Sequence, residues 1–493
     1  MTTIRKKTSY LFTAFIFIAV ATITPHYAIS QNTANLQKTV TDISKEESMK
    51  HGSLAVSVYS IDRKSLVYGF NQQKSVIPAS VTKLITTAAG FEKLGSGFRF
   101  RTTLGYSGNI DQNGTLHGNL FIIGGGDPLL GSYRYKQTVP DSLFIAWKRA
   151  VSAAGIKAVD GRVQYDASIF DNHPINDSWQ WGDIGNYYGS GVNGLNFHEN
   201  MFFIHFTPGA RIGYPATVSR TEPNGLALHI INEVTTGPAK TGDKVNVYGD
   251  PASTIRTCSG TMPIDNRNFS VRASLPKPGQ ACADLFTAYL RRNKISVSGA
   301  ASEALKRPSN MTTLLEYTSP TYFLIAQYTN MTSNNTYAES IHRYMGYKTG
   351  GLGSAANGCK AVEDYLKLLK LERSGVSFED GSGLSRKNRV TTDFLCRFLV
   401  EVSKASYFEL FYKTLPSAGE NGTVKNMLKN LPDGVTIRMK SGSMGAIRAY
   451  SGYITNAKGN QYCFAVIAND YDCTEAQIKA KLEKIIFAIA TME

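Results

Sequence analysis

Alternating apolar and polar residues near the start of the chain predict a β-hairpin. Residues 54–60 and 65–70 show this alternation on either side of the turn Asp62-Arg63-Lys64. A period of two places one side of each strand against a core and leaves the other side near water. We therefore expect a half-buried pair of antiparallel strands here.

A mostly apolar segment follows this hairpin and predicts a buried helix. Pro78 and Ala79 introduce Ser80, and the segment ends near Gly95. Its apolar positions are Leu84, Ile85, Ala88 and Ala89. Because Ser80 comes first, we expect it at the helix N-terminus, where free backbone N–H groups favour negative charge.

The C-terminal end of the chain predicts a second hairpin and a final helix. Residues 446–454 and 462–467 read as strands, and Thr474 with Gln477 forms the pattern of a capping box. Apolar residues then recur at helical spacing at Ile478, Leu482, Ile485, Ile486 and Ile489. Two terminal hairpins suggest one antiparallel sheet assembled from both chain ends, with the middle of the chain inserted.

The middle of the chain, residues 98–311, differs in texture from both ends. Gly, Asn and Pro are frequent, and short strand patterns predominate. Residues 124–128 read Gly-Gly-Gly-Asp-Pro, but no Lys-Ser/Thr pair follows as in a phosphate-binding loop. We expect a strand-ending turn there, within a mostly-β insertion.

The first thirty residues have the pattern of a signal peptide. Basic residues at 5–7 precede an apolar run at 10–23, and Ala28 and Ser30 suit cleavage before Gln31. The run is shorter than the roughly 20 residues of a membrane span. We expect export by a cleavable signal peptide to the periplasm, with an uncleaved N-terminal anchor as the alternative.

Charge adds little to this picture. The formal net charge is +15, but the basic residues are scattered and not gathered in patches interleaved with aromatic residues. This distribution argues against a nucleic-acid partner and favours a generic basic surface. Peripheral association with an anionic membrane or cell wall stays open.

Cysteines predict neither a metal site nor a fixed disulfide pattern. The six cysteines lie in the second half of the chain, without a Cys-x-x-Cys pair or metal-ligand spacing, at Cys258, Cys282, Cys359, Cys396, Cys463 and Cys473. After export, Cys258 with Cys282 and Cys463 with Cys473 are candidate pairs, and buried free thiols are the alternative. We expect no metal and no cofactor.

Candidate chemistry begins with Ser80-Val81-Thr82-Lys83. Residues three apart on a helix share a face, so Lys83 can reach the Ser80 hydroxyl and take its proton. Ser-x-x-Lys alone is a weak signal. A second element, Lys440-Ser441-Gly442-Ser443, directly precedes the C-terminal hairpin, where a substrate carboxylate could meet the amine and hydroxyls at a sheet edge.

A third element should supply a hydroxyl and an amide, and the sequence offers two candidates. Tyr328-Thr329-Asn330 is one, since a tyrosine can act as a base. We favour Ser333-Asn334-Asn335, because it enters a helix as a polar loop and leaves Ser333 and Asn335 free to project into a cleft.

The chain resembles the penicillin-recognising serine enzymes, whose signature is Ser-x-x-Lys, Ser-Asp-Asn and Lys-Thr-Gly. The matching residues occur in the order Ser80, Lys83, Ser333, Asn335, Lys440, Ser441 and Gly442. Asn334 stands where Asp is common, and Ser441 replaces Thr while keeping the hydroxyl.

Three further features narrow the resemblance to the low-molecular-mass, class C penicillin-binding proteins. They are the segment 380–386 (Asp-Gly-Ser-Gly-Leu-Ser-Arg), the turn at 124–128 and the long insertion. Members of this family are D-alanyl-D-alanine carboxypeptidases and endopeptidases. The resemblance implies attack on peptidoglycan stem peptides through an acyl-enzyme and covalent binding of β-lactam antibiotics.

The family also implies the fold and its divisions. We expect an α/β (α+β) architecture in which a serine β-lactamase/transpeptidase-like domain, an antiparallel sheet flanked by helices, is split by the insertion. The expected divisions are a signal peptide at 1–30, a catalytic domain at 31–97 and 312–493, and an inserted domain at 98–311 with a nested subdomain at about 195–265.

Roles follow from the same resemblance. Ser80 would be the nucleophile and Lys83 its base, with the backbone N–H groups of Ser80 and Ser443 holding the oxyanion. Ser333, in contact with both lysines, would relay a proton to the leaving amine, and Asn335 would fix the substrate amide. Lys440 and Ser441 would complete the catalytic set, and Gly442 and Ser443 would contact the substrate.

Two residues of the insertion are candidates for specificity. The segments Trp179-Gln180-Trp181-Gly182-Asp183 and Tyr187-Tyr188-Gly189 resemble a family segment that reaches the active site. By resemblance, Asp183 would meet the amino end of a diaminopimelate side chain and Tyr188 would pack on its stem. An aromatic loop that seals the domain interface is the alternative.

Other functions fit less well. A histidine-based hydrolase lacks a Gly-x-Ser-x-Gly elbow, and a metal peptidase lacks a His-x-x-x-His pair, so His198 and His342 are expected to be structural. A serine β-lactamase and a non-catalytic penicillin-binding sensor share the same machinery and stay as alternatives.

Overall fold

Both ends of the chain contribute strands to one antiparallel sheet, as the hydrophobic pattern predicts. The computed structural model describes residues 33–492, so the predicted signal peptide at 1–30 lies outside the described residues. The strands follow in the order β16 (Thr436–Met444), β17 (Ile447–Thr455), β18 (Gln461–Asn469), β1 (Ser53–Ser60) and β2 (Ser65–Phe70). The element predicted to carry Lys440 is therefore the edge strand.

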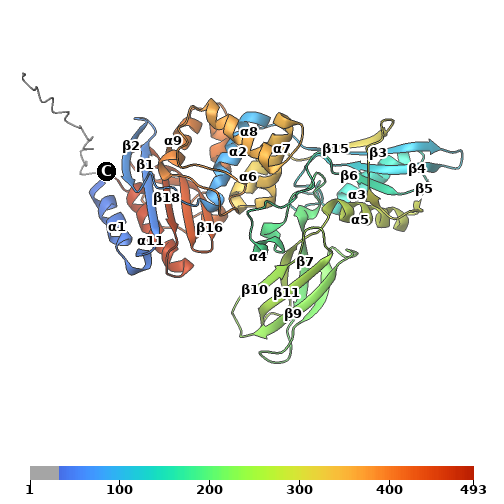
Figure 1. The fold of residues 1–493 in the computed structure, drawn as a ribbon, viewed down its shortest axis with the longest axis horizontal. Helices are drawn as coiled ribbons and strands as arrows, with labels where there is room; N and C mark the ends of the chain where they lie inside the picture. The colour runs from blue at the N-terminus through green and yellow to red at the C-terminus, as the bar shows by residue number, and fades with distance from the viewer. Residues whose placement is uncertain (1–32, 493) are drawn as a thin grey trace, which may run out of the picture.

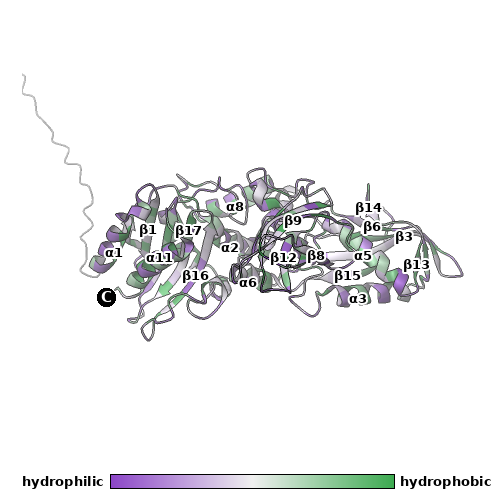
Figure 2. Cartoon of the chain, turned by 90° about the horizontal axis from the view of Figure 1, so that it is seen from below, coloured by the Kyte–Doolittle hydropathy of each residue, from purple (hydrophilic) through white to green (hydrophobic). Residues whose placement is uncertain are grey.

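Helices cover both faces of this sheet (Figure 1). Helices α1 (Ala34–Ser44) and α11 (Glu475–Ala490) pack on one face, and Figure 2 shows hydrophilic and hydrophobic residues on both helices. The helices associated with the other face are α2 (Lys83–Leu94), α6 (Tyr322–Thr332), α7 (Asn335–Gly350), α8 (Ala355–Leu368), α9 (Thr392–Val402) and α10 (Phe408–Thr414).

Strand β1 differs from its prediction because it is buried on both faces. Val56 and Val58 face the α11 side, whereas Ala55 and Tyr59 face the side of α9. The polar residue between them, Ser57, donates a hydrogen bond to Thr392 Oγ1 at 2.9 Å, which offsets the cost of burying its hydroxyl. Strand β2 at the edge keeps the partial exposure expected of both strands.

The predicted capping box at the start of α11 is confirmed. The backbone N–H of Gln477 donates to Thr474 Oγ1, and the backbone N–H of Thr474 donates to Gln477 Oε1. Both orphan donors are satisfied, which fixes where the last helix begins.

The insertion forms a lobe of its own, to the right in Figure 1. Its larger sheet contains β13 (Ser296–Val297), β5 (Ala158–Asp160), β4 (Thr115–Ile123), β3 (Arg101–Ile110) and β15 (Thr312–Thr318) in that order, with β6 (Val163–Asp166) beside β4 and β14 (Ser302–Glu303) beside β6. Helices α3 (Pro140–Ala153) and α5 (Pro278–Arg292) supply apolar side chains to the core beneath this sheet.

The boundaries of the insertion differ from those expected. We placed its end at residue 311, but β15 pairs with β3, so residues 312–318 belong with the insertion sheet. The nested subdomain, expected at about 195–265, extends to β12. Its strands are β7 (Met201–Thr207), β8 (Thr217–Glu222), β9 (His229–Gly237), β10 (Lys244–Tyr248), β11 (Ile255–Pro263) and β12 (Phe269–Ser274), arranged in two three-stranded sheets.

All six cysteines are free thiols. Cys258 lies in the core of the nested subdomain and Cys282 in the core of the larger insertion sheet, so this candidate pair is not formed. Cys463 and Cys473 are likewise unpaired, which leaves the alternative of free thiols. Within residues 33–492, every helix is too short or too polar to cross a membrane.

Candidate active site

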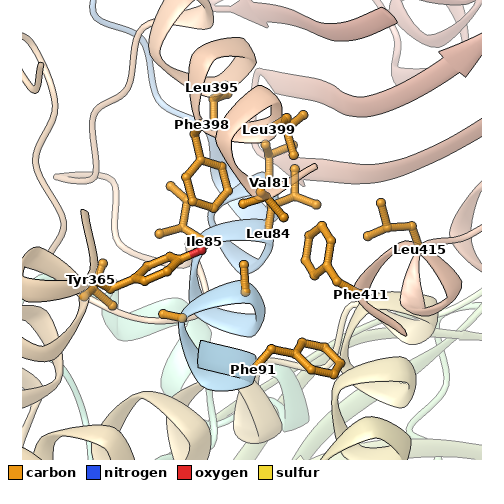
Figure 3. Close-up of a cluster of buried hydrophobic side chains, with 14 of the residues drawn as sticks. Val81, Leu84, Ile85, Phe91, Tyr365, Leu395, Phe398, Leu399, Phe411 and Leu415 are labelled. Carbon is orange, nitrogen blue, oxygen red and sulfur yellow. The ribbon is translucent and has the colours of Figure 1, made fainter. Parts of the chain in front are cut away.

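The candidate nucleophile lies in a short 3-10 turn, η3 (Ala79–Thr82), immediately before α2. This differs slightly from the predicted place at the α-helix N-terminus. Apolar side chains fix this turn and helix in place. Figure 3 shows four of them, Val81, Leu84, Ile85 and Phe91, facing a cluster of buried side chains from α8, α9, α10 and the residue that follows α10. The cluster comprises Tyr365, Leu395, Phe398, Leu399, Phe411 and Leu415. Because this turn and helix are buried on nearly all sides, the positions of Ser80 and Lys83 relative to the core are fixed.

Lys83 is fully buried and makes three hydrogen bonds. Its Nζ donates to Ser80 Oγ at 2.9 Å, to Asn335 Oδ1 at 2.6 Å and to the Ser382 carbonyl at 2.6 Å. Burial lowers the pKa of Lys83 to about 7, although the carboxylates of Asp380 and Glu339 act in the opposite direction. A large fraction of Lys83 is therefore uncharged near neutral pH.

These three partners decide where the lone pair of an uncharged Lys83 points. A neutral amine has two N–H donors and one lone pair, and an amide or backbone carbonyl oxygen can only accept. Asn335 Oδ1 and the Ser382 carbonyl therefore take the two N–H groups. Ser80, whose hydroxyl can donate, is the partner left for the lone pair, which is the arrangement of a base with its nucleophile.

A carbonyl from the insertion fixes the orientation of the Asn335 amide. Asn335 Nδ2 donates to the backbone carbonyl of Tyr188 at 2.7 Å, so the amide oxygen must face Lys83. The segment that carries Tyr188 therefore reaches the site, as the sequence led us to expect.

The favoured third element, Ser333-Asn334-Asn335, forms the turn between α6 and α7. Ser333 has a left-handed φ of 58° and ends α6, while Asn334 caps α7 by accepting the backbone N–H of Tyr337. The cap explains why Asn can stand where Asp is common, since both side chains offer the required oxygen. Ser333 and Asn335 lie on either side of the cap and face the lysines.

The competing element, Tyr328-Thr329-Asn330, lies inside α6 and serves the core. Asn330 is fully buried and donates to the hydroxyls of Thr87 and Thr414. The Tyr328 ring packs against Tyr337, with ring centroids 4.9 Å apart. Neither side chain has a role beside Lys83.

Lys440 on β16 forms a second pair of lysine and hydroxyl. Its Nζ donates to Ser333 Oγ at 2.9 Å and to the Ser441 carbonyl at 2.6 Å. Burial, reinforced by the positive charge of Lys83, holds the pKa of Lys440 well below its usual range. We expected Ser333 to contact both lysines, but among the described residues its hydrogen bond is to Lys440 alone, because Lys83 is saturated by its own three partners.

The residues that follow Lys440 on β16, Ser441 to Ser443, continue toward η3, the turn that carries Ser80, and Gly442 lies against it. A Cβ added at Gly442 would stand 2.7 Å from the Pro78 carbonyl and 3.0 Å from the Ser80 backbone nitrogen, so only glycine fits there. Ser441 Oγ shares a hydrogen bond of 2.7 Å with Thr423 Oγ1, and Ser443 is exposed at the end of the strand. Thr423 is a residue beside the site that sequence reasoning missed, because it lies in a short 3-10 turn, η6 (Gly422–Val424), 18 residues before its partner.

The insertion residues Asp183 and Tyr188 contact each other beside this site. Asp183 lies in the short helix α4 (Trp181–Ile184), and the Tyr188 hydroxyl donates to Asp183 Oδ1 at 3.3 Å. Desolvation raises the pKa of Asp183. Tyr188 remains 36% exposed and Trp181 58% exposed, so these rings border solvent and do not only seal an interface.

The two histidines expected to be structural are buried. Burial, together with the positive charge of Arg343, lowers the pKa of His342 to about 3, so it stays neutral. His198 Nδ1 donates a hydrogen bond to the Met201 carbonyl within a tight turn of the insertion. No group of side chains suited to a metal ion occurs among the described residues.

Comparison with known proteins agrees with this geometry. The model of the D-Ala-D-Ala carboxypeptidase 3 (S13) family matches residues 36–489. The chain belongs to this family of serine peptidases. It is accordingly a serine-type carboxypeptidase by class, as the resemblance implied.

Individual relatives of this carboxypeptidase family match over most of their length. The chain is 26% identical to a D-alanyl-D-alanine carboxypeptidase of Actinomadura sp. (strain R39), over 82% of this chain and 75% of that protein. It is 22% identical to the D-alanyl-D-alanine carboxypeptidase DacB of Haemophilus influenzae, over 87% of each. The crystal structure of penicillin binding protein 4 (dacB) from H. influenzae superposes with a TM-score of 0.77, at 21% identity, covering 91% of this chain and 98% of that one. The expected fold class is confirmed.

Proposed function

We propose that this carboxypeptidase removes the terminal D-alanine from peptidoglycan stem peptides by transferring the shortened peptide to Ser80. The observation that carries the proposal is the set of hydrogen-bond partners of Lys83. Two of them, Asn335 Oδ1 and the Ser382 carbonyl, can only accept, so the lone pair of the uncharged amine is left for the Ser80 hydroxyl. This geometry suits acyl transfer and needs no metal or cofactor.

The proposed reaction begins with attack of Ser80 Oγ on the carbonyl of the penultimate D-alanine. Lys83 takes the hydroxyl proton, and the backbone N–H groups of Ser80 and Ser443 stabilise the oxyanion. Ser333, which accepts a hydrogen bond from Lys440, passes its proton to the departing amine and takes a proton from the charged Lys440. Water then attacks the ester: Lys83 returns its proton to Ser80 Oγ, and the proton lost by the water passes through Ser333 to Lys440. The shortened peptide is released, and Ser80, Lys83 and Lys440 regain their starting protonation.

The C-terminal carboxylate of the substrate would lie along β16. This edge strand carries the Lys440 amine and the hydroxyls of Ser441 and Ser443. Gly442, which has no side chain, lets the substrate backbone approach. A bound carboxylate supplies an opposite charge, which raises the pKa of Lys440 and returns it to the charged form.

The same acyl-enzyme also accounts for two related reactions. A crosslink between stem peptides is a D-alanyl amide as well, so endopeptidase cleavage uses the same residues. A β-lactam antibiotic presents a strained amide with a nearby carboxylate and would acylate Ser80. The crystal structure of the H. influenzae relative has been solved in complex with a β-lactam.

A peptidoglycan substrate supports a location of the mature enzyme outside the cytoplasm. Peptidoglycan lies beyond the inner membrane, which fits periplasmic export through the predicted signal peptide at 1–30. Removal of residues 1–30 takes away Arg5, Lys6 and Lys7 and lowers the formal net charge from +15 to +12, which would still favour peripheral association with the anionic wall or membrane surface.

Purified muropeptides test the proposal. Incubation of the mature protein with pentapeptide monomers and crosslinked dimers should yield tetrapeptides and free D-alanine, and opened dimers if endopeptidase activity is present, all identified by mass. Acylation by penicillin without any release of D-alanine would favour a sensor. Rapid turnover of penicillin, faster than once in several minutes, would favour a β-lactamase. Ser80→Ala is the control for background hydrolysis.

A further inference from the structure

The backbone of Ser382 joins Lys83 to a buried carboxylate on α7, through two successive peptide groups. The Ser382 carbonyl accepts the Lys83 Nζ–H at 2.6 Å, and the backbone N–H of the same residue donates to Glu339 Oε1 at 2.7 Å. Ser382 is fully buried, so water cannot replace either partner. The position of Glu339 therefore bears on where the Ser382 carbonyl points.

Glu339 lies one helical turn after Asn335 on α7. Residues four apart share a helix face, so the same face carries both Asn335 and Glu339 toward Lys83. Asn335 contacts Lys83 directly, whereas Glu339 reaches it through Ser382. One helix thus controls both of the oxygens that occupy the N–H groups of Lys83.

The neighbouring residues of the Ser382 segment are held by other groups. Asp380 accepts hydrogen bonds from the Trp179 indole, the backbone N–H groups of Gly383 and Ser385, and the Asn388 amide. The Gly381 carbonyl accepts from Thr86 Oγ1 at 2.6 Å. Asp380 therefore holds the peptide group that contains the Ser382 carbonyl, through the Gly383 N–H, whereas Glu339 holds the preceding peptide group through the Ser382 N–H. The two carboxylates fix the backbone on either side of the Ser382 Cα.

We infer that Glu339 is a positioning residue for acyl transfer: it fixes the Ser382 backbone from its N–H side, which with Asp380 on the other side keeps the Ser382 carbonyl on Lys83 and leaves the lone pair of the amine directed at Ser80. The inference rests on the proposed function, since it assigns Lys83 the part of the base. It adds a residue that makes no contact with the nucleophile.

The charges around Lys83 support this inference and predict a second effect. The groups facing Lys83 are Glu339 on α7, Asp380 in the loop before α9, and Lys440 on β16. Burial and the nearby charge of Asp380 raise the pKa of Glu339 to about 7. In its charged form Glu339 favours the protonated form of Lys83, so loss of this carboxylate lowers the pKa of Lys83.

Two substitutions separate the hydrogen bond from the charge. Glu339→Gln keeps an oxygen for the Ser382 N–H and removes the charge, whereas Glu339→Ala removes both. Glu379→Gln is the matched control, because Glu379 is exposed on the same segment and its hydrogen bonds with Asn176 and Asn388 are made by its backbone atoms. Each full-length mature variant is checked for folding by thermal melting.

The experiment measures the acylation rate constant at saturating fluorescent penicillin as a function of pH, with the labelled peptide identified by mass. We expect the plateau rate to fall by about tenfold or more in Glu339→Ala, with penicillin affinity before acylation unchanged, and to stay within about threefold in Glu339→Gln. The acid limb should move to lower pH in both variants and stay in place in Glu379→Gln. A role in folding alone would lower the melting temperature without moving the limb.

Several outcomes would overturn the inference. A folded Glu339→Ala variant with the plateau of the unmodified protein would do so, as would an equal plateau loss in Glu339→Gln. If Glu339→Ala fails to fold, an unmoved acid limb in Glu339→Gln refutes it. Absence of label on Ser80 in the unmodified protein would instead refute the proposed function, and the inference with it.

Discussion

Two pairs of lysine and serine stand side by side in this site with the same bond length and opposite surroundings. Lys83 bonds Ser80, and Lys440 bonds Ser333, each with 2.9 Å between Nζ and Oγ. Both lysines are fully buried. Lys83 faces two buried carboxylates, whereas the charge that acts on Lys440 is the cation of Lys83.

This difference indicates how one residue type can take two roles. The carboxylates limit the fall in the pKa of Lys83, so its value of about 7 lies where a base is most effective near neutral pH. Burial and the cation of Lys83 hold the pKa of Lys440 well below its usual range, which suits a group that recovers its charge when a carboxylate binds. The number of partners differs as well: Lys83 has three acceptors and Lys440 has two among the described residues, so Lys440 keeps one position for a ligand.

The largest expected effect comes from the hydroxyl of the first pair. Ser80→Ala removes the only atom that can carry the acyl group in the proposed reaction, so covalent labelling by penicillin and release of D-alanine should both disappear. Intact-protein mass after incubation with penicillin measures the label. An adduct on this variant would move the nucleophile to another residue, and Ser333→Ala provides the comparison from the second pair, in which labelling should persist at a reduced rate.

Removing the amine of the first pair should have the next largest effect. Lys83→Ala leaves Ser80 without a base, and loss of general base catalysis is expected to slow acylation by about 10³-fold to 10⁴-fold. Stopped-flow fluorescence with a labelled penicillin gives the rate, and circular dichroism checks the fold. Acylation of this variant at the rate of the unmodified protein would show that Lys83 is not the base for Ser80.

The amine of the second pair should matter mainly for substrates with a free carboxylate. Lys440→Ala is expected to lower kcat/KM for a peptide ending in D-Ala-D-Ala by about 10²-fold, because a charged hydrogen bond to the carboxylate is lost. The same peptide with an amidated C-terminus is the matched control and should lose much less. Equal losses for both peptides would mean that Lys440 does not recognise the carboxylate.

The smallest expected effect lies outside both pairs, at Asp183. Asp183→Asn should reduce preference for a stem peptide whose third residue ends in a free amine, by about threefold to tenfold in kcat/KM, because an ion pair that borders solvent contributes little. A peptide with an acetylated amine is the control. An unchanged preference would assign the Asp183 and Tyr188 segment to the domain interface.

Much of this site follows from sequence because its motifs are local. Ser80 and Lys83 lie one turn apart, and Lys440 to Ser443 precede a recognisable hairpin, so residue type and spacing suffice. The sheet built from both chain ends follows from two hairpin patterns, one near each end of the sequence. The choice of Ser333 over Tyr328 also follows, because a polar loop before a helix exposes its side chains.

The missed contributions come from contacts without a local pattern. Ser382 contacts Lys83 through its backbone carbonyl, 299 residues away in the sequence. Since every residue has this oxygen, residue type gives no signal. Thr423 and Glu339 lie in segments whose composition is ordinary, and only tertiary packing brings them to Ser441 and Ser382. The end of the insertion was misplaced because residues 312–318 pair with β3, a partner that no spacing rule identifies.

The pH dependence of Ser80 acylation in the unmodified protein tests the comparison of the two lysines most directly. Protonated Lys83 cannot accept the hydroxyl proton, so the rate constant should be lost as pH falls through the pKa of Lys83 and reach a plateau above it. The account predicts a limb with its midpoint at about pH 7. A rate that is independent of pH through this range, or a limb near the ordinary lysine value of about 10.4, would contradict the assignment of Lys83 as the base.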